Sequence, residues 1–220
     1  MESYISQLQK ASLFAGISAE DIEKICTCLA VREKKIEKDT FVFCAGDDIQ
    51  WIYLIVSGSM HIINEDFWGN RSLIETMKEG TLFGEAYVFS RTEKHLTSVV
   101  AAENSIVLEI NPSKLLDTCS RKCSCHGELI KNIAFILSTK IVRLTEKVGH
   151  IMQRTIREKL RSYLTKCARE ANSNSFDIPY SRQQLADYLH VERSALSHEL
   201  SAMRDLKIVK YRKNHFELLN

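Results

Sequence analysis

Three cysteines and a histidine lie within one short segment, Cys119-Ser-Arg-Lys-Cys-Ser-Cys-His126. Thiolates and imidazole are the groups that bind zinc or an iron–sulfur cluster. Cys119, Cys123, Cys125 and His126 are therefore candidates for a metal or redox-sensing role. However, their spacing lacks the paired C-x2-C pattern of a zinc site and no second half follows, so we expect no metal and treat ordinary reduced thiols as the simpler alternative.

A second group of polar residues occurs near the C-terminus, in Arg193-Ser-Ala-Leu-Ser197. The pattern predicts a helix from about Arg193 to Met203 with its polar residues on the outward side. An arginine at the start of such a helix can make a bidentate contact to guanine, the commonest specific base contact in DNA. The residues that we expect to contact bases are Arg193, Ser194, Ser197 and His198.

The elements before and after this helix would position it on DNA. Ser181-Arg-Gln-Gln184 has the form of a capping box and opens a short helix that breaks around His190. Two short helices at this spacing predict a helix-turn-helix. Residues 207–219 then predict a hairpin with a basic tip, which makes the unit a winged helix. The residues that we expect to contact phosphates are Ser181, Arg182, Lys210, Arg212 and Lys213.

A long amphipathic helix is predicted upstream, from Glu128 to Ile151. Its apolar residues recur at steps of three or four, which is the pattern of a helix that packs against a partner helix. The length favours dimerisation over packing on the chain's own core. The expected dimer contacts are Ile130, Ile133, Leu137, Ile141, Leu144 and Val148.

Residues 32–112 carry short apolar stretches separated by glycines, which predicts a small antiparallel barrel or sandwich. Residues 1–30 predict short helices. The longest apolar run, from Trp51 to Val56, is too short for a membrane helix, and no export signal is visible at the start. Seven cysteines, an odd number, favour a reducing compartment. We therefore predict a cytoplasmic protein without a membrane segment.

The formal net charge of +2 conceals an uneven distribution. Residues 151–220 hold 13 lysines and arginines against 8 aspartates and glutamates, whereas residues 1–150 hold 17 against 20. The C-terminal part is thus basic, at +5, and the remainder is acidic, at −3. Such asymmetry is a hint of nucleic-acid contact at the basic end.

These motifs together resemble the Crp/Fnr superfamily of bacterial transcription regulators over nearly the whole chain. The matching residues are Gly46-Asp47, Tyr53-x-Ile-Val-x-Gly58, Phe83-Gly-Glu85, the long helix, Arg182-x-x-Leu-Ala-x-x-Leu189 and Arg193-Ser-Ala-Leu-Ser197. The resemblance implies an α+β fold with an N-terminal antiparallel β-roll of the cyclic-nucleotide-binding type, a long dimerisation helix and a C-terminal winged helix-turn-helix. The corresponding boundaries are 1–112 for the effector-sensing β-roll, 113–151 for the linker and dimerisation helix, and 152–220 for the DNA-binding domain.

The effector site departs from the pattern of cyclic AMP receptors. In those binders a glutamate holds the ribose and an Arg-Ser pair about ten residues later holds the cyclic phosphate. Glu85 matches the glutamate, but His95-Leu96 stands where the pair is expected, and leucine cannot hydrogen-bond a phosphate. We therefore expect an effector pocket that does not bind cyclic AMP tightly, and the effector itself stays unknown. The expected pocket residues are Phe83, Gly84, Glu85, His95 and Leu96.

The predicted function is a homodimeric regulator of transcription that binds a palindromic site in double-stranded DNA. A small-molecule effector in or near the β-roll would reorient the DNA-binding domains, and RNA polymerase is a further expected partner. The main alternative is a thiol- or metal-based redox-responsive protein that uses Cys119, Cys123 and Cys125, although Cys26, Cys28 and Cys44 are spaced too loosely for the iron–sulfur branch. A sensing adaptor with a degenerate helix-turn-helix is a second alternative. We expect no enzyme, because no paired catalytic carboxylates or Gly-rich nucleotide loop is present.

Overall fold

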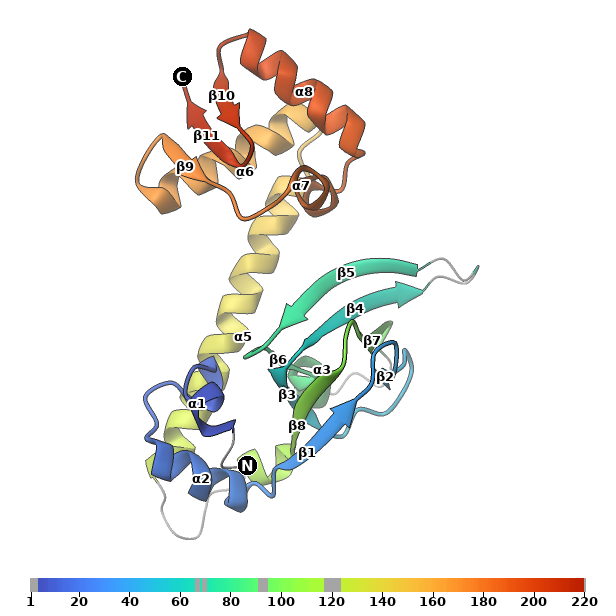
Figure 1. The fold of residues 1–220 in the computed structure, drawn as a ribbon, viewed down its shortest axis with the longest axis vertical. Helices are drawn as coiled ribbons and strands as arrows, with labels where there is room; N and C mark the ends of the chain where they lie inside the picture. Colours follow the sequence, from blue (N-terminus) through green and yellow to red (C-terminus); the bar gives the residue numbers. More distant parts are fainter. Residues whose placement is uncertain (1–3, 66–67, 69–70, 91–94, 117–123, 220) are drawn as a thin grey trace. The chain divides into compact units, whose positions relative to one another are not determined.

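The computed structural model describes residues 4–65, 68, 71–90, 95–116 and 124–219. The chain divides into two compact units, Met1–Ser138 and Thr139–Asn220 (Figure 1). The elements of the first unit are α1 (Ile5–Leu8), the short 3-10 helix η2 (Ser12–Phe14), α2 (Ala19–Cys28), β1 (Arg32–Ile36), β2 (Phe41–Phe43), β3 (Ile52–Ser57), β4 (Ser59–Glu65), β5 (Arg71–Lys78), β6 (Leu82–Phe83), α3 (Glu85–Phe89), β7 (Thr97–Ala101), β8 (Ser105–Ile110) and α4 (Pro112–Leu116). Helix α5 (Ser124–Ile151) begins in this unit and ends in the second.

The strands of the first unit form two four-stranded antiparallel sheets, with the orders β1-β8-β3-β6 and β2-β7-β4-β5. Every strand contributes to one shared apolar core, which therefore lies between the two sheets. Its buried members are Ile36, Phe43, Tyr53, Ile55, Met60, Met77, Phe83, Val99, Ala101 and Val107. The antiparallel β-roll predicted from the sequence is confirmed.

Strand β3 is buried on both faces, which accounts for the long apolar run at Trp51–Val56. Tyr53 and Ile55 point into the core between the sheets. The alternate residues Ile52, Leu54 and Val56 belong to a second core, which they share with helices α2 and α5. A strand covered on both sides reads as a continuous apolar stretch rather than as an alternating one.

Gly58 makes the tight connection between β3 and β4. Its φ of +85° lies in the left-handed region that favours glycine. A Cβ at this position would also lie 2.2 Å from Oγ of Ser105, so no larger residue fits. The glycine of the Tyr53-x-Ile-Val-x-Gly58 motif therefore has a steric reason.

The second unit combines three helices with a small antiparallel sheet whose order is β10-β11-β9 (Figure 1). Its elements after α5 are α6 (Ile156–Ala171), β9 (Ser175–Asp177), α7 (Arg182–Leu189), α8 (Arg193–Asp205), β10 (Val209–Arg212) and β11 (His215–Leu218). Its core contains Leu164, Leu185, Leu200 and Phe216 among others. This arrangement confirms the predicted winged helix-turn-helix.

Within the described parts of the chain, no helix is both long and apolar enough to cross a membrane.

Candidate functional site

The capping box predicted for the first helix of the helix-turn-helix is present. The Gln184 backbone N–H donates to Oγ of Ser181 at 3.3 Å, and the Ser181 N–H donates to Oε1 of Gln184 at 2.9 Å. Helix α7 ends at His190, whose φ of 56° is left-handed. The buried Ala186 leaves room for α8 to approach α7 closely.

Glu192 caps the recognition helix α8, a role that the sequence reasoning missed. Its carboxylate accepts from the Ser194 backbone N–H at 2.6 Å and from the Ser194 hydroxyl. These hydrogen bonds from Ser194 hold the pKa of Glu192 below its ordinary value. The acidic side chain therefore stabilises the N-terminus of α8, both as a hydrogen-bond acceptor and through its negative charge.

The four residues predicted to contact bases lie on one arc of α8. Arg193, Ser194 and His198 are exposed, and Ser197 is half-buried. The residues that anchor the helix, Leu196, Leu200 and Met203, are buried on the other side. On the inner flank Nε of Arg157 lies 2.5 Å from Oε1 of Glu199, which joins α6 to α8. Arg193 and His198 on this face are thus exposed to solvent, whereas the Ser194 hydroxyl already donates to Glu192, and base contact by the four residues stays a prediction.

A cationic cleft of about 670 Å³ lies where α7, α8 and the hairpin of β10 and β11 meet. The structure brings together here five of the nine residues predicted to contact DNA, whereas Ser194, Ser197, His198 and Lys210 do not line the cleft. The cleft also contains Asp177, Asn214 and His215, which the sequence reasoning did not single out. The lining residues are Asp177, Ser181, Arg182, Arg193, Arg212, Lys213, Asn214 and His215.

The hairpin of β10 and β11 forms the wing, and its turn carries the basic tip. Lys213 at this turn has a φ of 54°, a strained value for a residue with a side chain. His215 is held by β9: its Nδ1 lies 3.1 Å from Oδ1 of Asp177, and its Nε2 lies 3.0 Å from Oγ of Ser175. Lys210 stands apart from the cleft, with Nζ 3.9 Å from Oε2 of Glu217 across the hairpin.

Arg182 differs from the other candidate phosphate contacts because its guanidinium already has partners inside the protein. Its Nη2 donates to the carbonyl oxygen of Lys213 at 2.7 Å. Its Cζ lies 5.0 Å from the ring centres of both Tyr211 and Phe216. Burial lowers the pKa of Arg182 below its ordinary value, although an arginine remains charged.

The candidate effector site lies at the start of α3. Gly84 adopts a φ of +84° as the N-cap, and a Cβ there would lie 3.0 Å from the Trp51 carbonyl oxygen. The next residue, Glu85, is buried, and so is Phe83. Phe83 stacks on Tyr53 with ring centres 5.0 Å apart. The Phe83-Gly84-Glu85 motif is therefore held rigidly by its own backbone and neighbours.

The structure separates His95 from Leu96. His95 is only 7% exposed, with Nε2 2.7 Å from the Asp47 carbonyl oxygen and Nδ1 3.0 Å from that of Thr97. Its ring also contacts Tyr87 and Phe43, at centre distances of 4.7 and 5.5 Å. Leu96 is 77% exposed, so it does not share this buried environment. That both residues line one effector pocket stays a prediction.

Helix α5 carries an exposed apolar stripe whose residues are spaced three and four apart, as in a coiled-coil seam. The stripe includes Ile141 and Leu144, which are 64% and 62% exposed. Ile133 differs from the prediction, because it is buried in the chain's own core, and the exposed Ala134 takes its place on the stripe. The stripe consists of Ile130, Ala134, Leu137, Ile141, Leu144 and Val148, of which Leu137 is half-buried against the chain's own core.

The cysteine cluster is only partly within the described residues. Cys119 and Cys123 lie outside them. Cys125 is half-buried, and the buried His126 has its Nε2 3.2 Å from the Lys114 carbonyl oxygen. Among the residues that the structure describes, no three His, Cys, Asp or Glu side chains are grouped so that they could hold a metal ion. Burial raises the pKa of the Cys26 thiol to about 11, which makes it unreactive.

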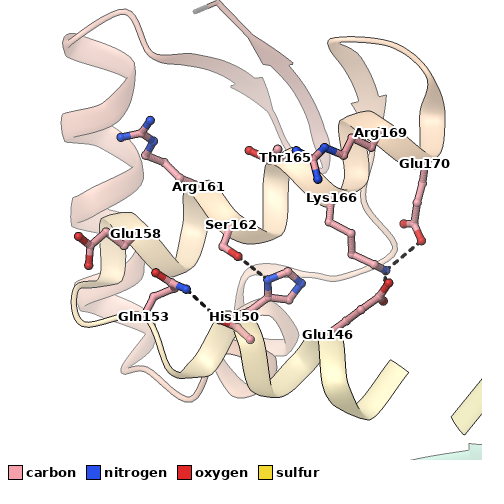
Figure 2. Close-up of a pocket in the computed structure, with 11 residues that line it drawn as sticks. Glu146, His150, Gln153, Glu158, Arg161, Ser162, Thr165, Lys166, Arg169 and Glu170 are labelled. Atoms are coloured by element: carbon pink, nitrogen blue, oxygen red, sulfur yellow. Dashed lines mark hydrogen bonds and ion pairs between the residues drawn. The ribbon is translucent and has the colours of Figure 1, made fainter. Parts of the chain in front are cut away.

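A groove of about 800 Å³ lies between the end of α5 and α6 (Figure 2). The buried His150 is at its base, with Nδ1 2.8 Å from Oγ of Ser162. Burial, together with the nearby Lys166, lowers the pKa of His150. Lys166 of α6 bridges to α5 through an ion pair with Glu146 at 3.2 Å, and it also pairs with Glu170 on its own helix at 3.0 Å. The groove is lined by acidic and basic side chains in equal number, and contacts of His150 and Glu146 with α6 connect the two helices.

Two family models match the chain, one within each of the two units. A cyclic nucleotide-binding domain matches residues 33–122, and a Crp-like helix-turn-helix domain matches residues 158–220. The chain belongs to the Crp/Fnr superfamily of transcription regulators. As a member of that superfamily it combines an effector-binding-type domain with a DNA-binding helix-turn-helix, and the superfamily is one of regulators rather than of enzymes.

Curated relatives of this Crp/Fnr regulator are distant but extend over most of its length. The "Anaerobic regulatory protein" of Bacillus subtilis is 22% identical over 89% of this chain and 82% of its own length. The "Fumarate and nitrate reduction regulatory protein" of Vibrio cholerae is 24% identical over 86% of this chain and 75% of its own length. The solved structure of CprK complexed with OCPA has a TM-score of 0.66 at 17% identity, covering 91% of this chain and 92% of that one, which shows the shared fold.

Proposed function

We propose that this protein is a homodimeric regulator that reads a palindromic site in double-stranded DNA and responds to an effector at its β-roll. The observation that carries the proposal is the cationic cleft between α7, α8 and the wing. It places the predicted base-reading Arg193 beside the predicted phosphate-binding Ser181, Arg212 and Lys213. A phosphate bound there would orient α8, because phosphate contacts fix register while base contacts carry the sequence information.

The exposed stripe on α5 supports dimerisation. Large apolar side chains repeated at coiled-coil spacing lose solvent exposure when a second copy of the helix packs against them. Two copies related by a twofold axis would present two recognition helices, so each operator would contain two half-sites about one DNA turn apart. RNA polymerase is the further partner that a transcription regulator implies.

Effector control would work through a shift between two arrangements of the DNA-binding units. The effector must bind one arrangement better than the other to move their populations. The buried Phe83, Gly84, Glu85 and His95 form the candidate effector region, and their neighbours argue against cyclic AMP. His95 is already engaged by backbone carbonyl oxygens and aromatic rings.

Selection of bound fragments from random double-stranded DNA tests this function. We expect enrichment of one palindromic sequence, and an affinity for it that falls steeply with rising salt because phosphate contacts release counterions. Lys213→Glu should abolish this binding. Lys24→Glu reverses an exposed charge on α2 and serves as the matched control that should bind normally. No enrichment, or a salt-independent affinity, would overturn the proposal.

A further inference from the structure

Arg182 connects the helix-turn-helix to the wing through its guanidinium. It is the first residue of α7, and it reaches the turn of the β10–β11 hairpin, where Nη2 donates to the Lys213 carbonyl oxygen at 2.7 Å. A hydrogen bond from a charged donor is stronger than one between neutral groups. The contact therefore holds one defined point of the wing against the start of α7.

The same guanidinium covers two aromatic rings of the hairpin. Tyr211 and Phe216 are opposite each other on β10 and β11, with ring centres 5.7 Å apart. The Arg182 Cζ lies 5.0 Å from each ring centre, within the range of a cation–π interaction. One side chain thus contacts both strands of the wing and its turn.

Two nitrogens of this guanidinium are poorly placed for a ligand, although the half-buried side chain lines the cleft. Nη1 is buried and, within the part of the chain that the structure describes, has no hydrogen-bond partner. Nη2 is occupied by the Lys213 carbonyl oxygen. A phosphate oxygen approaching through the cleft would find more accessible donors on the exposed Arg212, Lys213 and Arg193.

The backbone of Lys213 gives a reason for such a restraint. Its φ of 54° is unfavourable for a residue with a side chain, and strained backbone persists where the surroundings fix it. The hydrogen bond from Arg182 ends on the carbonyl oxygen of this same residue. On the opposite edge of the hairpin, Asp177 holds the His215 ring.

We propose that Arg182 is a positioning residue that fixes the wing turn relative to the helix-turn-helix, and not itself a phosphate contact. It would set the separation between the base-reading Arg193 and the phosphate-binding Lys213. The inference rests on the proposed DNA-binding function, but the claim that Arg182 fixes the wing turn can be tested without DNA.

Substitutions that keep or remove the charge separate positioning from phosphate contact. Arg182→Lys retains the cation but loses the planar group, whereas Arg182→Met loses both and keeps an apolar stem. We expect both variants to weaken binding to the selected site about tenfold, the effect of losing one hydrogen bond to a charged group. A phosphate contact predicts instead that Arg182→Lys binds nearly as well as the wild type, which would overturn the proposal.

A double-mutant cycle with the wing gives a second test. If Arg182 acts through the wing tip, Arg182→Met should cost little more once Lys213→Ala is present, because residues that act as a unit are not additive. If instead the two losses of binding free energy are additive, Arg182 contacts a phosphate independently. The slope of the logarithm of the binding constant against the logarithm of the salt concentration would then fall by about one for Arg182→Met alone, and the proposal would be contradicted.

Amide hydrogen exchange of the full-length protein without DNA supplies the independent readout. Arg182→Met and Arg182→Lys should speed exchange in residues 209–218 and leave the β-roll unchanged. Arg204→Met, which removes an exposed arginine paired with Asp205, is the matched control. Unchanged exchange in the wing overturns the positioning role. If wild-type protein binds no DNA, the proposed function fails while this readout still decides the role of Arg182.

Discussion

Nε2 of His95 lies 2.7 Å from the carbonyl oxygen of Asp47, where cyclic AMP receptors are expected to present an arginine to the cyclic phosphate. The Thr97 carbonyl oxygen holds the other ring nitrogen at 3.0 Å. The imidazole is therefore bound by the protein itself, and the exposed Leu96 supplies no hydrogen bond.

Cyclic AMP should consequently fail to bind at micromolar concentration. The measurement is calorimetric titration of the full-length protein, with the cAMP-activated relative Vfr of Pseudomonas aeruginosa titrated under the same conditions as a positive control. Micromolar affinity in this protein would show that the site recruits other groups for the phosphate.

Arg193→Ala should weaken binding to the selected operator by about 1–3 kcal/mol and relax the preference at one base of each half-site. The reason is the loss of the proposed bidentate base contact, which random DNA does not provide. Anisotropy titrations with the operator, with its single-base variants and with random DNA measure this. Equal losses on operator and random DNA would assign Arg193 to the backbone instead.

Replacing Glu192 should affect folding and DNA binding in opposite ways. Glu192→Ala removes the N-cap acceptor of α8 and should lower the melting temperature, whereas Glu192→Ser keeps an acceptor and should melt close to the wild type. Because Glu192→Ser also removes a negative charge near the duplex, it should bind DNA more tightly at low salt. Thermal melting and anisotropy on both variants check the two effects, and weaker binding by Glu192→Ser would mean that this carboxylate contacts a base.

Leu144→Asp should convert the proposed dimer to a monomer, because a charge in an apolar helix seam is strongly unfavourable. Val142→Asp is the matched control, since Val142 is similarly exposed, at 56%, but lies off the stripe on the same helix. Size-exclusion chromatography with light scattering distinguishes the two states. A dimer that survives Leu144→Asp, or one lost equally with Val142→Asp, would remove the stripe from the interface.

Stability should depend on pH through His150. Burial lowers its pKa in the folded protein, so the unfolded chain binds the proton more readily. The stabilisation is complete above the unfolded-state pKa of about 6.5 and is lost as the pH falls through the lower folded-state value. Urea denaturation followed by circular dichroism at pH 7.5 and 5.5 should show this loss. His150→Gln should reduce it, and an unchanged difference would place the titration elsewhere.

Local signals were sufficient to predict the helix-turn-helix. The capping box at Ser181 and the break at His190 depend on neighbours within one helical turn, so residue types and spacing determine them. Local signals do not show whether Ile133 or Ala134 lies on the exposed stripe of α5. Both fit a period near 3.6, and only the packing of α5 on α2 and β3 decides which residue faces the chain's own core.

The side-chain partners of the candidate sites could not be predicted for a related reason. From the sequence, Arg182 cannot be distinguished from the other basic residues predicted to contact DNA. Its contacts with Tyr211 and Phe216 join segments that are distant in sequence, so no local pattern predicts them. His95 and Leu96 are adjacent in the chain, yet successive side chains of an extended segment point to opposite sides. A motif therefore locates a pair of residues but does not show which of them is buried.

At the left-handed position of Lys213, the residue that best suits the backbone differs from the residue that best suits DNA binding. Glycine would relax the turn and make the hairpin easier to form, but it would remove the charge from the cleft. Variants chosen for heat resistance alone would therefore tend to gain a glycine here and lose affinity for DNA. The tightest turn of the wing is thus a place where a more stable protein would be a poorer regulator.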